Sequence, residues 1–70
     1  MGILRMIEDI LIYIAQHPDR TTEEIAAGLE LPFERVQMAV CDLINDDRVT
    51  QTGKRELDNG ELRPVYRVKP

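Results

Sequence analysis

The sequence predicts an α+β domain in which three helices are followed by a two-stranded antiparallel β-hairpin. Apolar residues recur at helical spacing through residues 3–16. Residues 21–46 have the pattern of two further helices, separated by a short turn that leads into Pro32. The last third carries Asn59-Gly60, the strongest two-residue hairpin signal, between two runs of strand character. A chain of 70 residues suits one small domain, which we place over residues 1–70.

The first helix is expected over residues 3–16, because Ile3, Ile7, Ile10 and Ile14 share one face. Pro18 follows and ends the helix. The apolar arc covers about half the circumference, which is wider than a usual core-facing stripe. Two interpretations stay open: the arc is covered within the domain, or one of its edges packs on a second copy. The second interpretation predicts a dimer interface at Leu4, Met6, Leu11 and Tyr13.

The second helix is expected over residues 22–29 and the third over residues 32–46. Thr21 and Glu24 have the spacing of a capping box at the start of the second helix. Pro32 suits the first turn of the third helix, where its missing N–H would have no partner anyway. The predicted core positions of the two helices are Ile25, Ala26, Leu29, Val36, Val40, Leu43 and Ile44.

The hairpin is expected over residues 48–69, with Asn59-Gly60 as a two-residue turn. That register pairs Leu57 with Leu62 and Glu56 with Arg63, and both pairs are favourable across strands. It also places Val49, Tyr66 and Val68 on one face, as a core-facing pattern requires.

Charge is distributed unevenly along the chain, whose net charge is −4. Residues 1–47 carry three basic and ten acidic side chains, a balance of −7. Residues 48–70 carry six basic and three acidic side chains, a balance of +3. Binding to nucleic acid needs clustered positive charge, and only the hairpin offers it, at Lys54, Arg55 and Arg63. The alternative for this cluster is a charged hairpin that stays soluble and resists edge pairing.

The order of these elements resembles the winged helix-turn-helix superfamily over nearly the whole chain. The residues that carry the resemblance are Thr21-x-x-Glu24-Ile25-Ala26, Leu31-Pro32-x-x-x-Val36, Leu43-x-x-x-Asp47-x-Val49 and Val65-Tyr66-Arg67-Val68. The chain looks like the DNA-binding part of bacterial repressors of the isocitrate-lyase-regulator and multiple-antibiotic-resistance types. It is also similar to small phage-encoded regulators.

The resemblance implies a transcriptional regulator that binds duplex DNA. In that superfamily the helix after the turn enters the major groove, and the hairpin, or wing, contacts an adjacent groove or the phosphates. By position, the implied DNA-binding residues are Thr22, Arg35, Gln37, Met38, Lys54, Arg55 and Arg63. A lone module reads few base pairs, so a homodimer through the first helix is expected.

The chain departs from the family pattern in two ways. Family members often have glycine where this chain has Glu30 and Asp47, so we expect the turn at Glu30 to differ in shape. Glu34 and Asp42 also lie on the helix that would read DNA, where a carboxylate more often repels phosphate than binds a base. The second hypothesis is therefore a protein-interaction module whose acidic helices bind a basic protein partner.

No pattern predicts catalysis, a cofactor or a metal site. The acidic residues lack a calcium-loop spacing, and no phosphate-cradling glycine loop or zinc signature occurs. Cys41 is the only cysteine, which is typical of a reduced, cytoplasmic setting; we expect it to be buried or half-buried. His17 is expected to cap the end of the first helix. The apolar run of residues 10–15 is too short to span a membrane.

Overall fold

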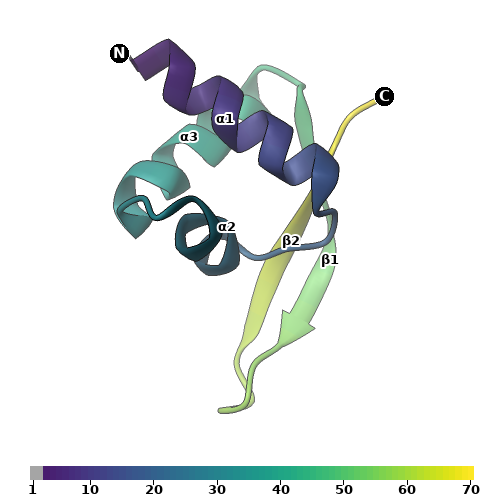
Figure 1. Cartoon of the computed structure of the whole chain (residues 1–70). Helices are drawn as coiled ribbons and strands as arrows, with labels where there is room; N and C mark the ends of the chain where they lie inside the picture. The colour runs from purple at the N-terminus through teal and green to yellow at the C-terminus, as the bar shows by residue number, and fades with distance from the viewer. Residues whose placement is uncertain (1–2) are drawn as a thin grey trace.

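Three helices pack at one end of a long β-hairpin in the computed structural model, which describes the backbone of residues 3–70 and the side chains from Arg5 onward. The elements are α1 (Ile3–Gln16), α2 (Thr22–Leu29), α3 (Phe33–Asn45), β1 (Val49–Glu56) and β2 (Leu62–Val68). The strands form one antiparallel sheet, and the tip of the hairpin extends away from the helices (Figure 1). The predicted α+β class, with three helices before a hairpin, is confirmed.

Local sequence signals explain both ends of α2. The hydroxyl of Thr21 accepts a hydrogen bond from the N–H of Glu24, whose carboxylate accepts one from the N–H of Thr21. This reciprocal pair is the predicted capping box. At the other end, Glu30 takes a left-handed conformation with φ of 56° and donates its N–H to carbonyls of the last turn. The expectation of a different turn shape at Glu30 is therefore wrong. Glu30 adopts the left-handed backbone conformation that glycine would adopt with less strain.

Helix α3 begins one residue later than predicted. Pro32 has extended backbone and serves as the N-cap residue, so Phe33 is the first helical residue. The buried stripe also lies slightly to one side of the predicted one. Ala39 is buried and Ile44 only half-buried, because the neighbouring helices cover the Ala39 side of α3.

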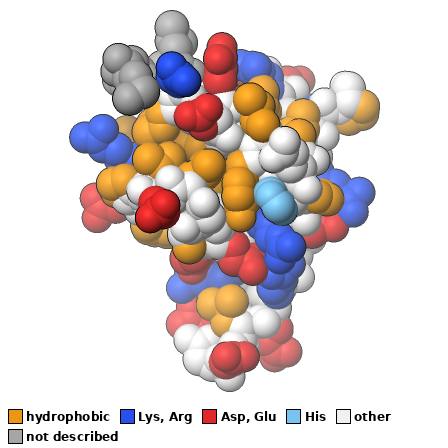
Figure 2. Space-filling model, viewed as in Figure 1, with side chains coloured by type: hydrophobic (Ala, Val, Ile, Leu, Met, Phe, Trp, Pro, Cys, Tyr) orange, Lys and Arg blue, Asp and Glu red, His pale blue; other side chains and the backbone are white. Residues whose placement is uncertain are grey.

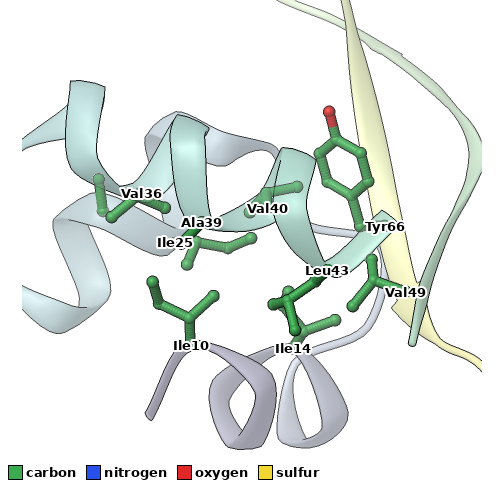
Figure 3. Close-up of a cluster of buried hydrophobic side chains, with 10 residues drawn as sticks. Ile10, Ile14, Ile25, Val36, Ala39, Val40, Leu43, Val49 and Tyr66 are labelled. Carbon is green, nitrogen blue, oxygen red and sulfur yellow. The ribbon is translucent and has the colours of Figure 1, made fainter. Parts of the chain in front are cut away.

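The core gathers one or more residues from every element (Figure 3). Val49 and Tyr66 bring both strands into this cluster, and Val68 packs against it, as predicted. Helix α3 packs on α1, α2 and β1 through one side, which is buried, while its opposite side faces solvent. The buried residues of the cluster are Ile10, Ile14, Ile25, Ala26, Val36, Ala39, Val40, Leu43, Val49 and Tyr66.

The hairpin register differs by one residue from the predicted register. Leu57 donates its N–H to the carbonyl of Glu61, and Gly60 donates to the carbonyl of Leu57. The loop therefore has three residues, with Gly60 in the left-handed position that such loops require (φ 86°). The predicted pairs of Leu57 with Leu62 and Glu56 with Arg63 are wrong. Glu56 faces Leu62 instead, and Arg55 faces Arg63.

A second irregularity lies at Thr52, where a bulge changes the register between Gln51 and Gly53. On the side of the bulge nearer the start of β1, Val49 is paired with Val68, and both contribute to the core.

None of the helices formed by the described residues combines the length and apolar character needed to cross a membrane.

Candidate interaction surfaces on α3 and the hairpin

The solvent-facing side of α3 carries both acidic and apolar groups. We define the outer face of α3 as five of its exposed residues, Glu34, Arg35, Met38, Cys41 and Asp42. Its formal charge is −1, because two carboxylates stand against one guanidinium. Met38 is 70% exposed, more than any other large apolar side chain that the structure describes. Cys41 is also exposed, so the expectation of a buried or half-buried cysteine is wrong: its position on α3 faces away from the core.

A groove lies between α1 and α3 beside this face. It encloses about 360 Å³, and its floor and walls are Met6 and Ile7 of α1 with Met38 and Ala39 of α3. Arg35 and Asp42 line it as its polar members. Seven residues are nearly two turns of helix, so these two charged groups lie on one side of α3, about 10 Å apart along its axis. Gln37 points elsewhere, because two residues turn a helix by about 200°.

The hairpin arginines face the helices and lie against carboxylates there. Arg55 and Arg63 are direct cross-strand neighbours, an arrangement that would repel if nothing else were nearby. Arg55 donates to both oxygens of Glu24, at 2.7 and 2.6 Å. Arg63 lies 3.2 Å from Glu23 and 2.7 Å from Glu61. The first turn of α2 thus neutralises the two arginines.

One of these contacts is electrostatic without being a hydrogen bond. The Nε of Arg63 is buried and has no hydrogen-bond partner, although it lies 3.2 Å from a carboxylate oxygen of Glu23. The distance allows attraction, but the angle is unsuitable for donation.

Two further ion pairs complete what we call the ion-pair belt, which comprises Arg55–Glu24, Arg63–Glu23, Arg67–Asp19 and Lys69–Asp47. Red and blue side chains alternate where the hairpin meets the helices (Figure 2). The belt accounts for four of the six basic residues of the C-terminal third. Lys54 and Arg48 form no ion pair with any side chain that the structure describes.

Asp19 is the most highly connected member of the belt. Its carboxylate accepts two hydrogen bonds from Arg67, at 3.0 and 2.7 Å, and one from the hydroxyl of Thr52 at 2.8 Å. Its carbonyl accepts a bond from Arg55, and its N–H donates to Tyr66. The loop between α1 and α2 is thereby fixed to both strands.

Contacts within the belt favour the ionised form of three carboxylates, those of Asp19, Glu24 and Asp47. The hydrogen bond from Arg67, reinforced by that from Thr52, lowers the pKa of Asp19 from 3.8 to about 2. Burial opposes ionisation of Glu24, but the hydrogen bond from Thr21 and the charge of Arg55 outweigh it, so its pKa is also lowered. The hydrogen bond from Lys69 lowers the pKa of Asp47.

We therefore expect the domain to lose stability in acid through the belt. A carboxylate whose pKa is lower in the folded state stabilises the fold above its unfolded pKa. For Asp19 that contribution is complete above pH 3.8 and is lost as the pH falls towards about 2. Urea unfolding at a series of pH values across this range would measure it. The Asp19→Asn variant should show a shallower decline, and parallel curves for the two proteins would contradict the role of Asp19.

The residues implied for DNA binding lie on α3, on the hairpin and at the start of α2. Arg35 and Met38 meet at the groove, while Gln37 is exposed on another side of α3. Arg55 and Arg63 belong to the belt, whereas Lys54 points to the opposite side of the hairpin and is exposed. The side chain of Thr22 is buried, with 7% of its surface exposed. The structure therefore does not assemble these seven residues into one surface.

The predicted dimer residues on α1 are also separated. Met6 lines the groove, but Leu11 is partly buried against the core. The ring of Tyr13 lies close over Gly28 of α2, where an added Cβ would come within 2.1 Å of its hydroxyl oxygen. The ring centroids of Tyr13 and His17 are 4.4 Å apart, so His17 contacts that ring. The side chain of Leu4 lies outside the described residues. Among the side chains of α1 from Arg5 onward, Ile12 is the large apolar one that is exposed, at 54%.

Sequence reasoning missed three participants in these surfaces. Ile7 and Ala39 line the groove, although the spacing of Ile7 placed it on the apolar face of the first helix and Ala39 was not among the predicted site residues. Glu23 was not among the predicted site residues, although it lies 3.2 Å from Arg63. The seven-residue spacing of Arg35 and Asp42 was the one available signal that they share a side of the helix. Among the described side chains, no cluster of three or more potential ligands could hold a metal ion.

Comparisons with models of known protein families, with curated proteins and with solved structures find no match to this chain.

Proposed function

We propose that this domain is a winged-helix protein-interaction module that binds a basic protein partner through the outer face of α3. The observation that carries the proposal is the composition of that face: Glu34 and Asp42 surround a Met38 side chain that is 70% exposed. An exposed methionine adapts to varied partner surfaces, and carboxylates attract cations. A partner with apolar and basic side chains at helical spacing would satisfy both groups.

The ion-pair belt supports the same conclusion from the hairpin. Binding to duplex DNA needs several Lys or Arg side chains directed at phosphates. Arg55 and Arg63 are instead directed at α2, with Glu24 and Glu23 as their partners. A phosphate would have to displace these carboxylates, and the displaced carboxylates would then lie beside it and repel it.

The test is fluorescence anisotropy with two labelled model peptides, one of leucine and lysine at helical spacing and one with glutamate in place of lysine. We expect the lysine peptide to bind and the glutamate peptide not to bind. The Glu34→Gln/Asp42→Asn variant should bind the lysine peptide at least about tenfold more weakly, because it loses two charges that face the partner. The matched control is Glu56→Gln/Asp58→Asn, which removes the same charge from the exposed hairpin. Equal weakening by both variants would show attraction to net charge alone and would overturn the proposal.

A specific set of observations favours DNA binding as the second candidate. Arg35, Arg48 and Lys54 are exposed and form no ion pair with the described side chains, so they are available to phosphates. The same anisotropy assay with random duplex DNA, at about 50 mM and about 200 mM salt, separates the two candidates. The primary proposal expects no binding at either salt. Binding that weakens steeply with salt would establish phosphate contacts and favour a DNA-binding regulator.

A further inference from the structure

The groove between α1 and α3 has one cation and one anion in its lining, on either side of an apolar centre. Arg35 and Asp42 line it from the same side of α3, and the midpoint between them falls between Met38 and Ala39. Those two residues are also part of the lining. The pattern along this side of α3 is therefore cation, apolar centre, anion, with nearly equal spacing on either side of the centre.

We propose that two copies of this chain pair through the groove about a two-fold axis that passes near Met38. A two-fold interface requires that residue i contacts j while j contacts i. With the two α3 helices antiparallel, Arg35 of each copy faces Asp42 of the other copy, so two ion pairs form at once. The proposal rests on the proposed use of α3 as a protein-binding face, and it names a second copy as the occupant of the groove.

Met38 provides the shape complement. Its side chain is 70% exposed at the edge of the groove, while Met6, Ile7 and Ala39 leave an apolar hollow beside it. In the two-fold arrangement, Met38 of each copy enters the hollow of the other. The apolar surfaces of Met38 and of the hollow are both unfavourable in water, and this contact removes them from water.

The same geometry limits the strength of the dimer. Few apolar residues line the groove, so the interface belongs among the small, weak ones and not among obligate dimers. We expect a dissociation constant between about 10 µM and about 1 mM. Because Arg35, Met38 and Asp42 belong to both surfaces, a basic partner on the outer face of α3 would compete with the second copy.

Sedimentation equilibrium of the full chain, from about 5 µM to about 1 mM, tests the pairing. The wild type should shift from monomer to dimer across this range. Arg35→Asp puts two carboxylates opposite each other at both ends of the interface, so the dissociation constant should rise at least about tenfold. Asp42→Arg should have the same effect. The double variant Arg35→Asp/Asp42→Arg restores opposite charges across the axis and should dimerise like the wild type.

Two control variants make the result specific. Lys54→Asp makes the same charge change as Arg35→Asp but on the outside of the hairpin, and Ile12→Ser removes an exposed apolar side chain of α1. Neither should alter the dissociation constant, and circular dichroism would check that every variant is folded. A wild type that stays monomeric at about 1 mM, a double variant that fails to recover, or dissociation caused by Ile12→Ser would each overturn the groove dimer. A monomer that still binds the leucine–lysine peptide would overturn this inference alone, whereas a dimer that ignores the peptide would overturn only the proposed function.

Discussion

Ile10→Ala is expected to lower the free energy of unfolding by about 2–5 kcal/mol. Ile10 is completely buried, with 0% of its surface exposed, and it belongs to the cluster that joins all three helices to the sheet. Truncation to alanine removes apolar contacts and leaves a cavity among residues that cannot fully collapse around it. A domain of this size has about 4–10 kcal/mol of stability in total, so the variant would lose a large share of it.

Ile12→Ala provides the matched control for Ile10→Ala, since it makes the same chemical change two residues away on the same helix. Ile12 is 54% exposed, so its truncation should change the free energy of unfolding by less than about 0.5 kcal/mol. Urea unfolding of both variants, followed by circular dichroism, would measure the difference. Similar losses in the two variants would mean that α1 presents a different face to the core.

The helices were predictable because their signals are local and redundant. The period of the apolar residues, the Thr21–Glu24 capping box and the proline before α3 each point to the same boundaries. Glu30 was the exception: intrinsic preference argued against a left-handed residue there, but its N–H bonds to the last turn of α2 hold it in that conformation. Tertiary packing and capping outweigh the preference of one residue.

The hairpin register was less predictable, because a difference of one residue changes which side chains face the helices. Asn59-Gly60 fits both a two-residue and a three-residue loop, and the choice depends on contacts distant in sequence. In the observed register Arg55 and Arg63 both face α2, where Glu23 and Glu24 neutralise them. The predicted register does not place these two like charges opposite each other. The sequence could not show that carboxylates of α2 lie close enough to neutralise them, because it does not reveal where α2 lies relative to the hairpin.

For the candidate surfaces, too, local features were predictable and features that depend on contacts distant in sequence were not. That α3 carries Glu34, Arg35 and Asp42 outside its buried stripe was predictable from helical spacing alone. That Met6 and Ile7 leave a hollow beside Met38 was not predictable, because it depends on how closely α1 approaches α3. The charge imbalance between the two parts of the chain was visible from the start. The structure shows that carboxylates of α2 form ion pairs with arginines of the hairpin, so the two oppositely charged parts of the chain partly neutralise each other.

Arg55→Ala is expected to destabilise the fold by about 1–2 kcal/mol and to leave the surface available to partners unchanged. Arg55 joins three segments, because it donates to the Glu24 carboxylate and to the Asp19 carbonyl from the middle of the hairpin. Hydrogen bonds to charged groups contribute about 1.5–3 kcal/mol when buried. The side chains of Arg55 and Glu24 are 39% and 38% exposed, so solvent screening reduces that figure.

Two neighbouring variants show whether the loss comes from the ion-pair belt. Lys54→Ala removes an adjacent cation that points away from the helices, and it should have almost no effect on urea unfolding. Arg55→Lys keeps the charge but cannot reach Glu24 and Asp19 together with a planar fork, so it should recover only part of the stability. If Arg55 instead served phosphate binding, Arg55→Ala would leave unfolding unchanged and would weaken attachment to duplex DNA of any sequence, with a smaller salt dependence. Unfolding and DNA anisotropy measured on the same preparations therefore separate a structural arginine from a DNA-binding one.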